Sequence, residues 1–212
     1  MLTSYRTIKQ SGDHEFTINK SRFITHITRA ADEVTAHSFI EQIKKEHWNA
    51  AHNCSAYLIG EQDHIQKAND DGEPNGTAGV PMLEVLKKRE LKDTVVVVTR
   101  YFGGIKLGAG GLIRAYGSSV SEALNHVGIV RRTLMQELVV SADYSLLGKL
   151  EYEARQSSYI LDSIDYEEQV KLHLYTPVEE AEACREWLVN ISSGQAGIEE
   201  GKQAFVETDE PS

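Results

Sequence analysis

Residues 94–117, TVVVVTRYFGGIKLGAGGLIRAYG, constrain this chain more than any other stretch. The β-branched apolar run that begins at Val95 predicts a buried strand. Five glycines follow within nine residues, and an apolar pattern at helical spacing starts near Leu112. Glycine costs conformational entropy on folding, so we expect it where the backbone needs positive φ or a close approach. The stretch therefore predicts a strand, a glycine-rich loop and a helix, in that order.

The cations of this stretch favour a binding role for the loop. Backbone N–H groups at the start of a helix, with cations nearby, suit an anion such as phosphate. The alternative is that the glycines only allow a tight turn and close packing of the helix on the strand. We predict nucleic-acid or phosphate binding by seven residues, namely Arg100, Gly103, Gly104, Lys106, Gly108, Gly110 and Arg114.

The loop matches neither of the two best-known phosphate-binding loops. A Walker A motif needs Lys directly after its last glycine, whereas Ala109 follows Gly108 here. A dinucleotide-binding fingerprint that starts at Gly108 would need a small residue where Ile113 stands, and no βαβ unit frames it. We therefore predict no cofactor.

Charge divides the chain into two parts. The 212 residues suffice for one large domain or two small ones, with a proper core. Residues 1–130 contain 15 Lys+Arg and 15 Asp+Glu, whereas residues 131–212 contain 7 and 17, which accounts for the net charge of −10. Different charge in the two parts suggests different partners. We expect an N-terminal domain at 1–130 and a C-terminal domain at 131–212.

Cysteine usage and hydropathy indicate the compartment. Cys54 and Cys184 are far apart, so there is no disulfide framework and no zinc-binding spacing. The first residues lack the apolar run of a signal peptide, and no segment has the ~18 apolar residues of a membrane span. We expect a cytoplasmic protein without membrane contact, and the oligomeric state stays open.

Periodicity predicts an α+β protein. In the first part we expect a hairpin at 14–18 and 22–28, a helix at 32–48, strands at 51–60 and 64–69, a loop at 70–79 and a helix at 77–88. The second part restarts with the order βαββαβ in about 80 residues, which is typical of a ferredoxin-like split βαβ domain. Its second helix is expected to begin with a capping box at Thr176, and its last strand to cover 203–207.

The loop at 70–79 is acidic and invites a metal interpretation. From Asp71 onward it mimics the first half of a calcium loop, but the closing Glu would fall on Met82. We predict no such site, and a weak magnesium or hydrogen-bonding role is left open beside a solvated turn. We expect positive φ at one or more of its glycines and a position beside the glycine-rich loop. The candidate residues here are His52, Asp70, Asp71, Glu73 and Thr77.

No catalytic residue is predicted. His52 and Cys54 stand two apart on an expected strand, so their side chains share a face. Nucleophilic catalysis needs a third, orienting group, and the sequence supplies none. A lone buried cysteine usually packs as a small hydrophobe.

Three ordered motifs carry a family resemblance. HNCSA (52–56), DDGEPNGTAGVP (70–81) and VTRYFGGIKLGAGGLIRAYG (98–117) resemble the YigZ/IMPACT family. The resemblance implies that the first domain has the two-layer α/β fold of a small-subunit ribosomal protein and of the fourth domain of elongation factor G. It implies that the ferredoxin-like second domain is similar to the fifth domain of that factor. It also implies a link to translation control, since the eukaryotic relatives act as regulators through protein–protein binding, and it implies no settled catalytic mechanism.

These observations favour a translation-associated regulator that binds RNA, the ribosome or a translation factor through the glycine-rich basic loop. Affinity would come from contacts with about two to four phosphates. Two alternatives stay open. One is an enzyme acting on a phosphorylated small molecule, with Asp71 or Glu73 as base. The other is a pure protein-interaction module.

Overall fold

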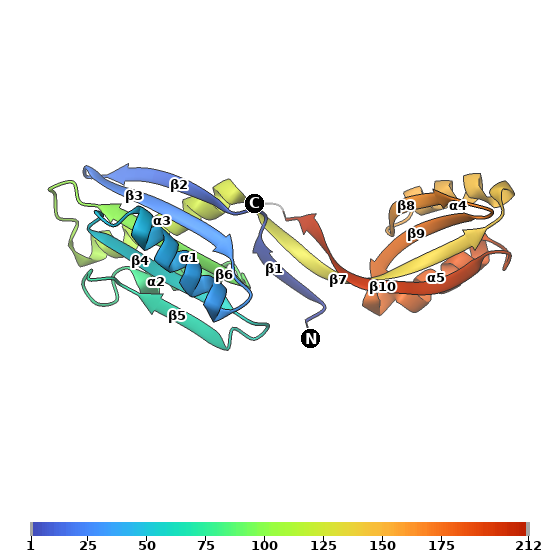
Figure 1. Cartoon of the computed structure of the whole chain (residues 1–212), viewed down its shortest axis with the longest axis horizontal. Coiled ribbons are helices and arrows are strands. Elements are labelled where there is room, and N and C mark those ends of the chain that lie inside the picture. The colour runs from blue at the N-terminus through green and yellow to red at the C-terminus, as the bar shows by residue number, and fades with distance from the viewer. Residues whose placement is uncertain (1, 211–212) are drawn as a thin grey trace. The chain divides into compact units, whose positions relative to one another are not determined.

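The computed structural model describes residues 2–210, which form two compact units. The first unit extends to Arg131 and includes the end of the chain from Thr208, and the second is Arg132–Glu207. The first unit contains β1 (Ser4–Ile8), β2 (Gly12–Ile18), β3 (Ser21–Arg29), α1 (Glu33–Glu46), β4 (His52–Ile59), β5 (Ile65–Asn69), α2 (Gly79–Lys88), β6 (Thr94–Tyr101) and α3 (Gly108–Val127), as labelled in Figure 1.

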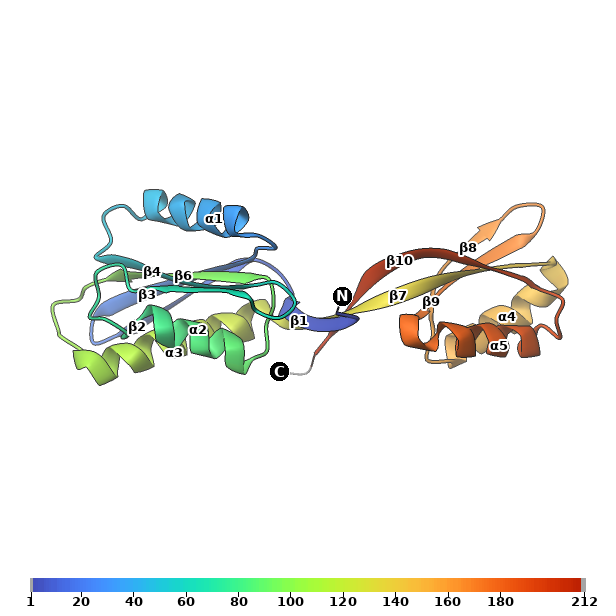
Figure 2. The same cartoon turned by 90° about the horizontal axis from the view of Figure 1, so that it is seen from below.

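The first unit has three layers, not the two expected from the resemblance. Its antiparallel sheet has the strand order β2-β3-β6-β4-β5. Helix α1 covers one face, and α2 and α3 cover the other (Figure 2). Strand β6 shows why: Val95 and Val97 pack in the cluster under α1, and Val96 and Val98 in the cluster under α2 and α3. An uninterrupted β-branched run is typical of a strand that is buried on both faces.

Local signals set the starts of the helices. Asp32 caps α1, as predicted, and accepts a hydrogen bond of 2.7 Å from the backbone N–H of Thr35. Helix α3 begins at Gly108, four residues before the expected start at Leu112. Its apolar face, which includes Tyr116, is buried against the sheet.

The second unit has the expected order βαββαβ. It contains most of β7 (Ile129–Ala142), α4 (Tyr144–Gln156), β8 (Ile160–Tyr166), β9 (Val170–Pro177), the short helix η1 (Val178–Glu180), α5 (Ala181–Ile191) and most of β10 (Gly197–Asp209). Strand β7 pairs with β9 and β10, and β9 also pairs with β8. Both α-helices pack on one face of this sheet (Figure 2), so this unit has two layers.

Three details differ from the sequence prediction. The capping box at Thr176 does not form, because Thr176 is paired with Gln136 in the sheet and α5 starts only at Ala181. The last strand is longer than 203–207, and β1 was not predicted. The chain end joins the first unit through ion pairs of Glu210 with Arg6 (2.7 Å) and Arg131 (2.5 Å).

None of the helices described between residues 2 and 210 is long and apolar enough to cross a membrane.

Candidate functional site

Two loops distant in sequence line one cavity of the first unit, which has a volume of about 380 Å³. Glu73 and Pro74 come from the loop that follows β5, and Lys106 and Leu107 come from the loop before α3. The prediction that these loops lie side by side is confirmed. The rest of the lining consists of His52, Arg100, Phe102, Gly108, Ala109 and Leu112.

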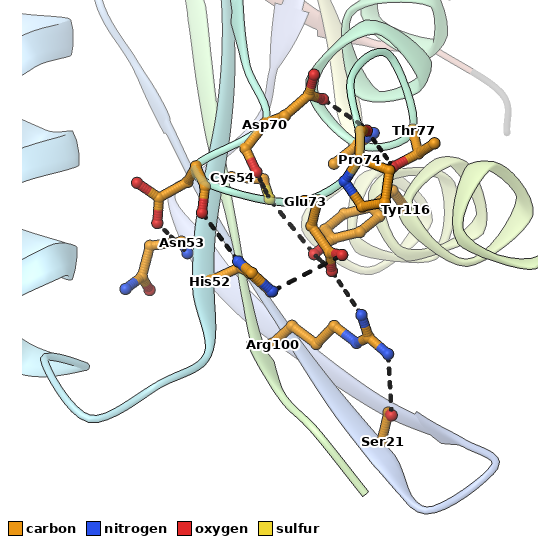
Figure 3. Close-up of polar contacts among 12 residues, drawn as sticks. Ser21, His52, Asn53, Cys54, Asp70, Glu73, Pro74, Thr77, Arg100 and Tyr116 are labelled. Atoms are coloured by element: carbon orange, nitrogen blue, oxygen red, sulfur yellow. Dashed lines mark hydrogen bonds and ion pairs between the residues drawn. The ribbon is translucent and has the colours of Figure 1, made fainter. Parts of the chain in front are cut away.

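Strand pairing brings the polar side chains of the cavity together. His52 begins β4 and lies directly opposite Arg100 of β6 in the antiparallel register. Side chains of directly opposed residues lie on the same face of a sheet. This face is the one covered by α2 and α3, since Cys54 and Val98 farther along the same strands belong to that cluster. In Figure 3, His52 and Arg100 both point toward Glu73.

Glu73 is the centre of this network, and its two carboxylate oxygens differ. Oε1 accepts hydrogen bonds from Arg100 Nη1 at 2.6 Å and from the Tyr116 hydroxyl at 2.8 Å. Among the described residues Oε2 has no hydrogen bond, and its neighbouring nitrogen is His52 Nε2 at 3.7 Å. The Glu73 side chain is only 3% exposed. The protein donors thus hold one oxygen, whereas the other is left to the cavity that Glu73 lines.

The tautomer of His52 follows from its other ring nitrogen. Nδ1 lies 2.9 Å from the backbone carbonyl oxygen of Asp71. A carbonyl only accepts, so Nδ1 carries the proton and donates. In the neutral ring Nε2 is therefore an acceptor, and it lies on the side of Glu73. The imidazole and the carboxylate leave between them a place for a group that can donate a proton.

Arg100 is held from several sides and is not a free cation. Its side chain is 6% exposed, and its guanidinium lies over the rings of Phe23 and Phe102, at 5.4 and 5.5 Å from the ring centroids. Nη2 is 3.4 Å from Ser21 Oγ (Figure 3). Its Nε is buried without a hydrogen-bond partner. A buried arginine paired in this way orients Glu73 more than it attracts a distant phosphate.

Asp70 fixes the shape of the acidic loop. Its carboxylate accepts hydrogen bonds from the backbone N–H groups of Gly76, Ala78 and Gly79, at 2.7, 3.1 and 2.8 Å. Burial acts to raise the pKa of Asp70, but these three hydrogen bonds outweigh it and hold the pKa below its usual value. Thr77 donates to the carbonyl of Pro74 at 2.6 Å. Asp70 and Thr77 thus shape the loop and do not line the cavity.

Asp71 ties the loop to its surroundings. Its carboxylate accepts from Lys44 Nζ at 2.9 Å and from the backbone N–H of Asn53 at 2.7 Å. The backbone is left-handed here, with φ of 44° at Asp71 and 88° at Gly72, and Gly76 follows with φ of 76°. The expected positive φ at glycines of this loop is confirmed.

Cys54 lies behind the cavity and is not reactive. It donates toward the carbonyl of Asp70 at 3.0 Å, and Tyr116 is 3.3 Å away. Burial raises the pKa of the Cys54 thiol to about 12. Burial also raises the pKa of Tyr116, so both groups stay protonated at neutral pH. Neither supplies a nucleophile.

The N-terminus of α3 opens into the cavity. Gly108 and Ala109, its first two residues, line the wall. The N-cap residue Leu107 has no side chain that could cap the first N–H groups. The dipole of this 20-residue helix places about half a positive charge at that end. Exposed Lys106 adds a full charge and has no ion-pair partner among the described residues. This wall of the cavity suits an anion.

Two kinds of glycine shape the loop before α3. A Cβ at Gly103 would lie 2.0 Å from the backbone carbonyl of Lys20, so only glycine fits where β6 leaves the sheet. Gly104 and Gly108 instead have φ of 85° and 69°, a region that side chains disfavour. The loop thus needs glycine both for close approach and for positive φ.

The predicted site residues fall into two groups. The cavity brings together His52, Glu73, Arg100, Lys106 and Gly108. Outside its lining are Asp70, Asp71, Thr77, Gly103, Gly104, Gly110 and Arg114. Sequence reasoning missed the lining residues Phe102 and Leu112 and the Glu73 partner Tyr116. The apolar pattern that starts near Leu112 predicted only a helix over this stretch, and no spacing signal marks Phe102.

The carboxylates of the acidic loop accept hydrogen bonds from donors of the protein. Within residues 2–210, no group of three or more His, Cys, Asp and Glu side chains is arranged to hold a metal ion. The carboxylate oxygens of Asp70 and Asp71 instead accept hydrogen bonds from backbone N–H groups and from Lys44.

Comparisons with known proteins give two matching domain families and full-length relatives. The Impact N-terminal domain matches residues 19–124, and a domain of unknown function (DUF1949) matches residues 140–195. IMPACT family member YvyE of Bacillus subtilis is 61% identical over 98% of this chain and 95% of its own length. IMPACT family member YigZ of Escherichia coli is 36% identical over 84% and 88%. A crystal structure of a hypothetical protein, 32% identical, matches with a TM-score of 0.61 over 93% of this chain and 97% of that one.

Proposed function

The chain belongs to the IMPACT family, and from this premise we propose that its first unit binds single-stranded RNA in the cavity as part of a role in translation. The observation that carries the proposal is the start of α3. It presents N–H groups that have no side-chain cap to a cavity that exposed Lys106 also lines. Such a helix start takes a phosphate group well.

An aromatic ring at the rim supports RNA over an inorganic anion. Phe102 is 51% exposed and lines the cavity together with Leu107 and Leu112. Unstacked bases of a single strand bind by stacking on such rings. A cavity of about 380 Å³ accommodates one nucleotide, with its phosphate at α3 and its base on Phe102.

Charge limits the number of phosphates that are bound. Glu73 neutralises Arg100, so among residues 2–210 the cations near the cavity that no ion pair neutralises include Lys106 and, farther along α3, exposed Arg114. We therefore expect contact with one or two phosphates, fewer than the two to four inferred from sequence. The log–log salt slope should be about −0.7 to −1.4 for a single strand.

The second unit has a different part in this proposal. Residues 131–212 contain 17 acidic and 7 basic residues, so this region repels RNA and suits a protein partner on the ribosome. The strand order β10-β7-β9-β8 supports a ferredoxin-like fold for this unit. We take the two units as separate domains, with likeness to the fourth and fifth domains of elongation factor G.

Fluorescence anisotropy with a labelled single-stranded RNA and co-sedimentation with ribosomes test the proposal. Phe102→Ala should weaken RNA binding about tenfold or more, because one base loses its stacking partner. Lys106→Ala should weaken binding and reduce the salt slope by about 0.7. RNA binding by both variants at parental affinity would contradict the proposal.

Matched controls come from the same unit. Trp48→Ala removes an aromatic side chain that is 81% exposed and does not line the cavity. Lys88→Ala removes an exposed cation at the end of α2. Both controls should bind RNA nearly as the parent does. If all four variants weaken binding equally, the contact surface lies elsewhere and the cavity is not the RNA site.

A further inference from the structure

Glu73 and His52 form a recognition site on the cavity wall that phosphate binding does not use. A phosphate bound at the start of α3 needs donors, whereas Glu73 Oε2 is an acceptor, as is Nε2 of His52 in the neutral form of the ring. A second group on the ligand, one that donates a proton, has to account for them. This inference rests on the RNA-binding function proposed above and asks which part of a nucleotide the acceptors read.

The carboxylate is built to present one oxygen. Arg100 and Tyr116 occupy Oε1 at 2.6 and 2.8 Å, and they hold the side chain in a single orientation. Oε2 stands 3.7 Å from His52 Nε2, too far for a direct hydrogen bond. The Glu73 side chain is 3% exposed and lines the cavity, so Oε2, whose partner positions are not taken by protein donors, is available to a ligand hydroxyl that enters the cavity.

A ribose 2′-hydroxyl has the chemistry that these acceptors require. It donates one proton, and its oxygen accepts. It stands beside a phosphate in every RNA nucleotide and is missing from DNA. We infer that Glu73 Oε2, positioned by Arg100 and Tyr116 and flanked by His52, accepts the proton of a ribose 2′-hydroxyl, so the cavity selects ribonucleotides over deoxyribonucleotides.

The parent protein tests this inference without any substitution. Single strands of one sequence are compared by anisotropy as RNA, DNA, 2′-fluoro and 2′-O-methyl forms. RNA should bind about tenfold tighter than the other three, because only RNA donates a hydrogen bond to the charged oxygen. If all four strands bind equally and Lys106→Ala loses this binding, the inference is overturned and the RNA-binding proposal stays in place. No binding of any strand overturns both.

A substitution then assigns the preference to Glu73. In Glu73→Gln the amide oxygen still accepts from Arg100 and Tyr116, which places the NH₂ group at the Oε2 position. The NH₂ group can only donate to the 2′-oxygen, which the 2′-O-methyl strand also carries, so this variant should lose the preference for RNA over the 2′-O-methyl strand, whereas Lys106→Ala should weaken the binding of both strands and keep their ratio. If Glu73→Gln does not fold, His52→Ala replaces it and should reduce the ratio. A tenfold RNA preference retained in a folded variant of either residue overturns the assignment.

A ribose hydroxyl beside a phosphate also occurs in free nucleotides. Adenosine 3′-monophosphate and its 2′-deoxy analogue are therefore added as competitors. Displacement by the ribonucleotide alone supports 2′-hydroxyl recognition and identifies the free nucleotide as its source. No displacement, together with a preference for the RNA strand, assigns the recognition to RNA. Equal displacement by both competitors overturns the inference.

Discussion

Glu73 Oε1 accepts a hydrogen bond of 2.6 Å from Arg100 Nη1, and the two side chains are only 3% and 6% exposed. Removing one partner of a buried pair leaves the other charge unpaired, which costs about 3–5 kcal/mol. We expect Glu73→Ala to lower the free energy of unfolding of the first unit by about this amount. Urea unfolding followed by circular dichroism measures it.

The pair of Glu15 and Arg22 is the matched control. It has the same separation of 2.6 Å but is 44% and 51% exposed. An exposed pair contributes about 0–1 kcal/mol, so Glu15→Ala should have little effect. Equal losses of unfolding free energy in Glu73→Ala and Glu15→Ala would show that burial does not determine how much the Glu73–Arg100 pair contributes to stability.

The sequence predicted the strand and the loop that carry this pair, but not the pair itself. The β-branched run before Arg100 identified β6, and the turn residues around Asp70 identified the loop. The contact depends on the antiparallel register that places His52 opposite Arg100, and register is a tertiary property. Arg100 was therefore taken as a free phosphate ligand, although Glu73 neutralises it.

The layer count was misjudged for a related reason. The run Val95–Val98 already indicated burial on both faces, because no polar residue interrupts it. The expectation of two layers came from the resemblance and did not account for α1 on the second face of the sheet. Strand β1 lacks such a signal, since SYRTI contains three polar residues, and hydrogen bonds such as Lys92 N–H to the Arg6 carbonyl (2.8 Å) hold it.

Asp70→Asn should loosen the acidic loop. The amide has only one oxygen for the three N–H donors, and its NH₂ group would face at least one of them. Because one or more partly buried hydrogen bonds are lost, we expect a loss of about 1–2 kcal/mol in the free energy of unfolding. The pKa of Asp70 lies below its usual 3.8, so its contribution is present above that pH and is lost as pH falls through the lower value. Unfolding measured from neutral pH down to about pH 3 checks both statements. A constant difference between parent and variant over that range would contradict the pKa shift.

His173 should make the second unit less stable in alkali. It lies 2.8 Å from Glu137 and 3.2 Å from Asp165. The hydrogen bond with Glu137 raises the pKa of His173 above its ordinary 6.5, although burial opposes the change, and the same bond lowers the pKa of Glu137. The interactions that raise the pKa of His173 contribute their full stabilisation to the folded second unit below pH 6.5. This contribution is lost as pH rises through the pKa of His173 in the folded state. His173→Gln should therefore cost more free energy of unfolding at about pH 5.5 than at about pH 9.

Fluorescence of Trp187, which packs on the core of the second unit, follows this unfolding. Lys171→Ala is the control, since Lys171 pairs with Glu167 at 2.7 Å and its pKa is raised above 10.5. Its cost should be the same at both pH values. A His173→Gln cost that does not change with pH would contradict the assigned ion pairs.

Gly103→Ala and Gly110→Ala separate the two reasons for glycine in the basic loop. At Gly103 a Cβ would lie 2.0 Å from the backbone carbonyl of Lys20, so the β2–β3 turn or the loop has to move. We expect a loss of about 3 kcal/mol or more. At Gly110 the neighbouring atom is Arg114 Nη1 at 3.7 Å, and alanine favours a helix over glycine by up to about 1 kcal/mol. Gly110→Ala should therefore be as stable as the parent or more so, and thermal melts of the two variants decide.

Because Gly110 stands in the first turn of α3, RNA binding by this stable variant then reports whether a ligand backbone needs the open space. Unchanged affinity would limit the contact to the cavity lining, and a loss of affinity without a loss of stability would extend it along α3.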